Sequence, residues 1–185
     1  MEPAIKPLDK LLFYKYLDKA THYMEFGSGG STYQASLRPN IKSICTVESD
    51  LEWIQKLQAK VTHPSIKYNY IDIKSCSKSF GYPGKGCSQD DMKKYSDVNV
   101  PSDTDLVLID GRFRVACCLK LFNQVNNECI VAFDDFLDRK LYYDIVLNYY
   151  DIIEETKNNS LVILRKKNCE PPSNELIVKY EIIPG

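Results

Sequence analysis

Apolar residues recur along the chain with two different spacings. Leu8, Leu11 and Leu12 follow a helical spacing, which predicts an amphipathic helix over 7–19. Short apolar or β-branched runs predict five strands, at 23–26, 41–47, 66–73, 105–109 and 129–133. Further helices are expected at 31–37, 51–61, 112–125 and 138–149. This alternation of strands and helices predicts a parallel sheet with helices on both faces.

The pattern changes after residue 149. Two strands are expected at 150–155 and 161–165, and the residues between them are too few for a crossover helix. The pair must therefore form a hairpin, so the last strand of the sheet runs antiparallel. After a break at Pro171-Pro172, the tail 170–185 contains a strand-like run, 177–183, which could pair with a sheet edge, cover the site or join a partner chain.

One long segment, 74–101, does not follow the alternation. It contains the glycine-rich run Gly81-Tyr82-Pro83-Gly84-Lys85-Gly86 and many polar residues. Irregular segments of this length inside a compact domain are usually functional or disordered. We interpret the segment as an active-site flap, and an insertion without a function is the alternative.

Composition limits the class of protein. The chain has 185 residues, which predicts one domain over 1–185, and its 44% hydrophobic and 26% charged content is ordinary for a soluble globular protein. A net charge of −1 gives no electrostatic reason to expect nucleic acid or a membrane surface as a partner. Residues 1–20 lack an apolar leader, so the seven cysteines are expected to be reduced thiols in a cytoplasmic protein. A disulfide or metal at Cys76 and Cys87 is a minor alternative, and Cys117-Cys118 is expected on a buried helix face.

The stretch from Tyr23 to Thr32 is the strongest candidate for a ligand site. A short strand carrying Glu25 ends in Gly27-x-Gly29-Gly30 and leads into a helix. A P-loop would need Gly-Lys-Ser/Thr here, and a dinucleotide fingerprint would need glycine in place of Thr32. S-adenosylmethionine (SAM) carries a sulfonium and an ammonium group and has no pyrophosphate. A carboxylate beside the turn therefore fits SAM better than it fits a dinucleotide. A plain glycine-rich turn is the alternative.

Acidic residues follow most of the predicted strands. These residues are Glu48, Asp72, Asp110, Asp134 and Asp135. Ligands of open α/β sheets lie beyond the carboxyl ends of the strands. Glu48 could accept hydrogen bonds from both ribose hydroxyls of an adenosine, although acids at strand ends also cap helices. Trp53, the only tryptophan, is interpreted as a packing residue.

The motif Glu25-x-Gly27-x-Gly29 and the C-terminal hairpin together resemble the class I SAM-dependent methyltransferase superfamily. The resemblance covers about residues 23–166. The strings Asp110-Gly-Arg-Phe-Arg-Val-Ala-Cys117, Phe133-Asp-Asp-Phe136 and Gly81-Tyr82-Pro83 are similar to an uncharacterised branch of methyltransferase-like proteins. The resemblance implies an α/β fold with a Rossmann-like, mostly parallel sheet that ends in an antiparallel hairpin strand.

The resemblance also implies roles for particular residues. The residues expected to bind SAM are Glu25, Phe26, Gly27, Ser28, Gly29, Ser31, Thr32, Glu48, Ser49, Asp72 and Asp110. Catalytic roles are expected for Asp110, Asp134, Asp135 and Arg112, and substrate contacts for Arg112, Arg114 and Tyr82. The three aspartates also resemble the metal-binding set of catechol- and macrocin-type O-methyltransferases, so a divalent ion such as Mg²⁺ is left open. Arg112 and Arg114 depart from that pattern, because they could pair with the acids or hold an anionic substrate.

These features favour a SAM-dependent methyltransferase that acts on a small-molecule hydroxyl, since no added domain or basic patch is available for a macromolecule. A non-catalytic SAM-binding or interaction module on the same fold is the second hypothesis. Transfer of another group from a SAM-derived donor, such as aminopropyl transfer, is the third. The sequence does not give the acceptor, the use of a metal, the activity or the oligomeric state, for which a homodimer is one option.

Overall fold

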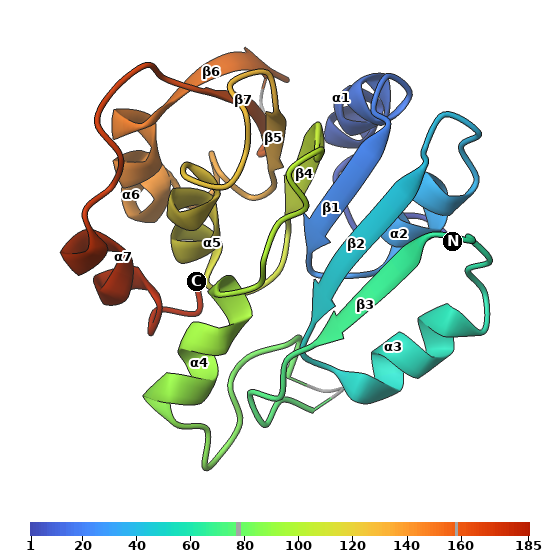
Figure 1. Cartoon of the computed structure of the whole chain (residues 1–185), viewed down its shortest axis with the longest axis horizontal. Helices are drawn as coiled ribbons and strands as arrows, with labels where there is room; N and C mark the ends of the chain where they lie inside the picture. The colour runs from blue at the N-terminus through green and yellow to red at the C-terminus, as the bar shows by residue number, and fades with distance from the viewer. Residues whose placement is uncertain (77–78, 158) are drawn as a thin grey trace.

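The computed structural model describes residues 1–76, 79–157 and 159–185. Its centre is a sheet of seven strands in the order β3-β2-β1-β4-β5-β7-β6 (Figure 1). The strands are β1 His22–Phe26, β2 Ser43–Glu48, β3 Ile66–Tyr70, β4 Leu106–Ile109, β5 Ile130–Phe133, β6 Tyr150–Glu155 and β7 Val162–Lys166. Strands β1 to β5 pair in parallel, whereas β7 is antiparallel to both β5 and β6. The predicted parallel sheet with a closing antiparallel hairpin is therefore confirmed.

Helices connect and cover the strands. They are α1 Pro7–Leu17, α2 Gly30–Ser36, α3 Leu51–Gln58, α4 Gln89–Ser96, α5 Arg114–Leu121, α6 Lys140–Tyr143, the 3₁₀ helix η1 Asp144–Asn148 and α7 Asn174–Tyr180. The helix expected over 138–149 is in fact two short elements, α6 and η1. Among the residues described, none of the helices has the length and apolar character needed to cross a bilayer.

Two expectations about local structure were wrong. The strand-like run 177–183 begins in a helix, α7, because Ser173 accepts a hydrogen bond from the backbone N–H of Leu176 and caps the helix. Segment 74–101 is not wholly irregular, since Ser88 and Asp91 form a capping box that starts α4. Residues 77 and 78 of that segment lie outside the part of the chain described, as does residue 158 of the predicted hairpin turn.

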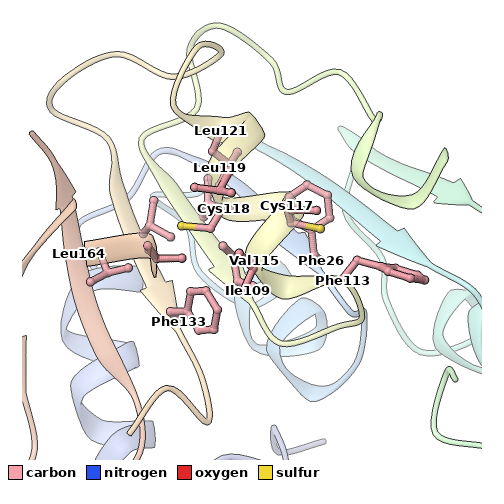
Figure 2. Close-up of a cluster of buried hydrophobic side chains, with 14 of the residues drawn as sticks. Phe26, Ile109, Phe113, Val115, Cys117, Cys118, Leu119, Leu121, Phe133 and Leu164 are labelled. Atoms are coloured by element: carbon pink, nitrogen blue, oxygen red, sulfur yellow. The ribbon is translucent and has the colours of Figure 1, made fainter. Parts of the chain in front are cut away.

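Both faces of the sheet are covered. Consecutive residues of β4, Val107 and Leu108, are fully buried but belong to opposite hydrophobic clusters, as the pleat of a strand requires. The larger cluster packs α5 against the centre of the sheet, and Figure 2 shows side chains from that helix facing strand residues such as Ile109 and Phe133. Cys117 and Cys118 are both fully buried there, which confirms the buried helix face.

A buried carboxylate joins the first helix to the last hairpin. Asp9 of α1 is fully buried and accepts hydrogen bonds from the backbone N–H groups of Ser160 (2.8 Å) and Leu161 (3.2 Å). The Thr156 hydroxyl also donates to it. A buried carboxylate without hydrogen-bond partners would destabilise the fold. These donors therefore hold α1 against the hairpin.

Candidate active site

A cleft of about 560 Å³ opens at the carboxyl ends of β1, β2, β4 and β5. Strands β2 and β4 lie on opposite sides of β1, so the cleft is at the point where the strand order reverses. The sequence-predicted residues that line it are Gly27, Ser28, Glu48, Ser49, Asp110, Arg112, Arg114, Asp134 and Asp135. The structure thus brings together residues that are more than a hundred positions apart in the sequence.

The turns after β1 and β4 pack directly against each other. Gly27 has φ +95°, and a Cβ there would lie 2.8 Å from the Cα of Gly111. A Cβ on Gly111 would in turn collide with the hydroxyl of Tyr95. Both positions therefore require glycine, and the two turns form one floor for the cleft.

Glu25 lies beneath this floor and does not line the cleft. Its buried carboxylate accepts hydrogen bonds from the hydroxyls of Tyr23 (2.8 Å), Ser31 (2.6 Å) and Thr32. Burial raises the pKa of Glu25 to about 7, against the opposing effect of these donors. Phe26 is in the core, and Gly29, Ser31 and Thr32 also lie outside the cleft lining, so this part of the predicted SAM set joins β1 to α2.

Glu48 lines the cleft at the end of β2. It is 9% exposed, and its two oxygens accept from the backbone N–H groups of Ser28 (3.1 Å), Ser49 (2.6 Å) and Asp50 (3.0 Å). Burial still raises its pKa. Beside it, the indole N–H of Trp53 donates to the Ser28 carbonyl (2.8 Å) and the ring lines the cleft, so Trp53 does more than pack in the core.

Asp72 does not reach the cleft. Its exposed carboxylate accepts from the Nζ (2.6 Å) and the backbone N–H (2.9 Å) of Lys74, which lower its pKa. This contact leaves Asp72 at the edge of the sheet, beyond β3.

On the other side of the cleft, Arg114 is the centre of the acidic cluster that follows β4 and β5. Its side chain is 3% exposed, and Nη2 lies 3.1 Å from Asp110 and 3.2 Å from Asp135. The same guanidinium donates to the backbone carbonyl of Asp134 (2.6 Å). Two residues in left-handed backbone conformations, Phe113 (φ +52°) and Asp135 (φ +58°), make these turns tight enough for the pairing.

Two of these aspartates, Asp110 and Asp134, hold their protons unusually tightly. Burial, and then the charges of Asp110 and Asp135, raise the pKa of Asp134 to about 8. Burial also raises the pKa of Asp110, although Arg114 opposes this. Two neighbouring carboxylic acids with raised pKa values are a common arrangement where a proton is moved during catalysis.

The aspartates do not fit a divalent metal ion. The guanidinium of Arg114 lies within ion-pair distance of two of them and occupies the position that a shared cation would need. Within the described residues, no group of three or more His, Cys, Asp or Glu side chains is placed to hold a metal. Arg114 thus serves as a counter-ion for Asp110 and Asp135.

Arg112 lies at one edge of the cleft and contacts Tyr82, which lies just outside it. The Arg112 guanidinium lies 4.3 Å from the centre of the Tyr82 ring, and both side chains reach the Gly185 carbonyl. Gly81 and Phe80 of the same loop line the cleft, whereas Tyr82 lines a second cavity next to it.

Sequence reasoning missed Ala4, Lys56 and Tyr95 in the cleft lining. Tyr95 could have been found, because the Ser88-x-x-Asp91 capping box marks the helix that carries it. No local pattern marked Ala4 or Lys56.

No protein-family model matches the chain, and no curated protein matches it by sequence. Solved structures do resemble it. A methyltransferase-like protein from Silicibacter pomeroyi shares 22% identity over 99% of this chain and 98% of its own, with a TM-score of 0.82.

Two further solved structures are more distant. An RNA methyltransferase from Salinibacter ruber in complex with S-adenosyl-L-homocysteine (SAH) is 14% identical over 94% of this chain and 98% of its own, with a TM-score of 0.56. The N-methyltransferase NodS from Bradyrhizobium japonicum is 10% identical over 87% and 98%, with a TM-score of 0.51. At these identities the likeness establishes the fold, and the seven-stranded sheet of this chain is a Rossmann-like methyltransferase fold.

Proposed function

We propose that this protein is a SAM-dependent methyltransferase that acts on a hydroxyl group of a small molecule. The observation that carries the proposal is the composition of one cleft, in which Glu48 on one side faces the Asp110–Asp134–Asp135 cluster on the other. The first acid suits an adenosine ribose, and the cluster suits a cationic donor and a proton transfer.

The residues of the cleft fit SAM. Five carboxylates line it, from Glu48, Asp50, Asp110, Asp134 and Asp135, and three cations, from Lys56, Arg112 and Arg114. The acids of the lining outnumber its cations, which favours a ligand with positive charge. The volume, about 560 Å³, is within the usual range for small-ligand sites.

A dinucleotide fits less well. Its pyrophosphate would need the first turn of α2, the helix that follows the glycine turn. The backbone of Glu2 and Pro3 packs so closely on Gly30 that a Cβ there would collide with it. The N-terminal segment thus packs against the first residue of the helix that a pyrophosphate would approach.

When bound, SAM would supply an electrophilic methyl group on its sulfonium. The protein would have to orient an acceptor hydroxyl and remove its proton. Asp134 is the better candidate base, because Asp135 already pairs with Arg114 and with Arg139 (3.3 Å). Arg114 would hold Asp110 and Asp135 in place, and Arg112 would contact the acceptor at the edge of the cleft.

The acceptor class rests on the size and charge of the site. An RNA methyltransferase with the same fold shows that the fold alone does not select the acceptor. A net charge of −1 offers no general attraction for a polyanion, which favours a small molecule. A SAM-binding module without catalysis remains the second candidate, because Glu48 and its backbone donors would serve it equally well.

Calorimetric titration with SAM, SAH and NAD, with and without Mg²⁺, tests the proposal. We expect both adenosyl ligands to bind, NAD not to bind, and Mg²⁺ to have no effect. Transfer of labelled methyl groups to a panel of hydroxyl compounds then separates an enzyme from a binding module. Failure of SAM and SAH to bind at millimolar concentration would overturn the cofactor assignment.

A further inference from the structure

A second cavity, of about 600 Å³, lies next to the cleft on the other side of Arg114. It is formed by α6, α7, the chain end and Tyr82, and Figure 1 shows α6 and α7 near each other on the side of the molecule where the chain ends. Its lining residues are Tyr82, Arg114, Val115, Arg139, Leu141, Tyr142, Tyr143, Lys179, Tyr180, Ile183, Pro184 and Gly185. Arg114 is the residue that the cavity and the cleft have in common.

The lining is aromatic and apolar to an unusual degree for a surface cavity. Four of the twelve lining residues are tyrosines, and four more are aliphatic or proline. Leu141 is 95% exposed and Tyr142 is 73% exposed, so the chain itself does not cover them. Exposed apolar side chains gathered at a cavity are typical of a binding site.

The polar part of the lining is basic. Arg114, Arg139 and Lys179 line the cavity, and none of the lining residues that the structure describes carries an acidic side chain. Asp135 is shared between the two arginines, at 3.2 Å and 3.3 Å, so one negative charge balances two positive charges. Lys179 has no ion-pair partner in the described part of the chain, and its Nζ lies 5.7 Å from the Tyr180 ring. The cavity therefore favours an anion beside an aromatic ring.

The wall between the cavity and the cleft is thin. Tyr82 faces the cavity, and Arg112, stacked on the same ring at 4.3 Å, faces the cleft. A molecule held in the cavity would have one end beside Arg114 and close to the acidic cluster.

Building on the proposed function, we infer that this cavity binds the methyl acceptor and that the acceptor is an aromatic compound with an anionic group. The ring packs among the tyrosines, the anion lies against Lys179 and Arg139, and the hydroxyl points past Arg114 toward Asp134.

The test is calorimetry on the protein saturated with SAH. The probes are 4-hydroxybenzoate and phenyl phosphate, with 4-hydroxybenzamide as the neutral twin and cyclohexanecarboxylate as the non-aromatic twin. We expect the aromatic anions to bind at least tenfold more tightly than either twin. Equal binding of the neutral twin, or no binding of either aromatic anion at millimolar concentration, would overturn the inference.

Variants make the assignment specific to the cavity. We expect Lys179→Gln to weaken binding of 4-hydroxybenzoate about three- to fivefold, as for a half-exposed ion pair. Tyr142→Ala is expected to weaken it about tenfold, and its exposure makes the substitution safe for the fold. Lys42→Gln, at an exposed site near the start of β2, is the matched control and should change nothing. If neither cavity variant weakens binding, the cavity is not the site.

The two proposals can fail separately. Trp53 is the only tryptophan and lines the cleft but not the cavity, so its fluorescence reports SAH binding independently. If the aromatic anions bind with the expected variant pattern and SAH does not bind, the cavity stands as an anion site and the methyltransferase proposal fails. If SAH binds and the anions do not, only the acceptor class fails.

Discussion

The two sides of the cleft stabilise their acidic side chains with different kinds of partner. On the β1–β2 side, Glu25 and Glu48 are held by hydroxyl and backbone donors of these strands and of the turns that follow them. On the β4–β5 side, Asp110 and Asp135 instead pair with the cation Arg114, and Asp135 also pairs with Arg139. Burial raises the pKa of acids on both sides, but among the described residues only the second side relies on side-chain cations. We therefore propose that the first side binds the cofactor and that the second side carries the chemistry.

The largest effect is expected from removing the buried Arg114. Arg114→Met would leave Asp110 without its counter-ion and Asp135 with Arg139 alone, and should lower the free energy of unfolding by about 3–5 kcal/mol. Urea unfolding at pH 7.5 measures this, with Arg165→Met, at an exposed position, as the control. The loss should shrink as the pH is lowered, because Asp110, whose pKa is raised by burial, needs no counter-ion once it is protonated, and a loss that does not change with pH would contradict this account.

Glu25, on the β1–β2 side of the cleft, should also make the stability of the protein depend on pH. Its pKa in the folded protein is about 7, above the ordinary 4.5, so the folded state holds the proton more tightly. The stabilisation is complete below pH 4.5 and is lost as pH rises through 7, by about 3 kcal/mol in total. The measurement is chemical unfolding of the wild type and Glu25→Gln from pH 4.5 to 8. The variant should lack this component, and identical pH curves would exclude the raised pKa.

Asp134→Asn tests the assignment of chemistry to the β4–β5 side. We expect methyl transfer to fall at least a hundredfold, about 2.7 kcal/mol in the barrier, with SAH affinity unchanged. In the wild type, the rate should rise with pH up to about 8, because the base must lose its proton. A single-turnover pH profile with labelled SAM checks both points. If Asp134→Asn keeps the wild-type profile, Asp134 is not the base.

The smallest effect is expected on the β1–β2 side. Glu48→Gln keeps the shape of the side chain but replaces one carboxylate oxygen, an acceptor, with an NH2 group, which is a donor. SAH affinity should therefore fall about tenfold, near 1.4 kcal/mol. Asp72→Asn, which lies outside the cleft, is the control and should bind SAH normally. Calorimetry that gives equal affinities for wild type and Glu48→Gln would remove Glu48 from the ribose site.

The sequence predicted best those features that a few neighbouring residues decide. The hairpin at 150–165 and the cap at Asp50 were predictable, because short spacing and a single capping side chain decide them. The strand-like reading of 177–183 was wrong. The β-branched side chains of this run favour a strand, but the cap at Ser173 and the packing of Ile177 against the core stabilise a helix instead.

The candidate site was predictable in kind but not in detail. Acids at strand ends indicated a cleft, and Glu48 and Asp110 do line it. Nothing local showed that Glu25 would turn inward to bond three hydroxyls. Pairing of an arginine with the acids was one of the expected alternatives, but the sequence did not show that Arg114, rather than Arg112, would contact both Asp110 and Asp135. Those contacts depend on backbone conformations such as the left-handed Phe113 and on strands far apart in the chain.

The carboxylate of Asp9 has a consequence for how the protein is made. Its partners are Thr156, Ser160 and Leu161, so the contacts of Asp9 cannot form until the β6–β7 hairpin has been synthesised. Contacts over such separations slow folding and prolong exposure of apolar surface. A ribosome that stalls within β5 would therefore hold a chain in which the carboxylate of Asp9 has no partner and the β4 edge of the sheet is open to aggregation.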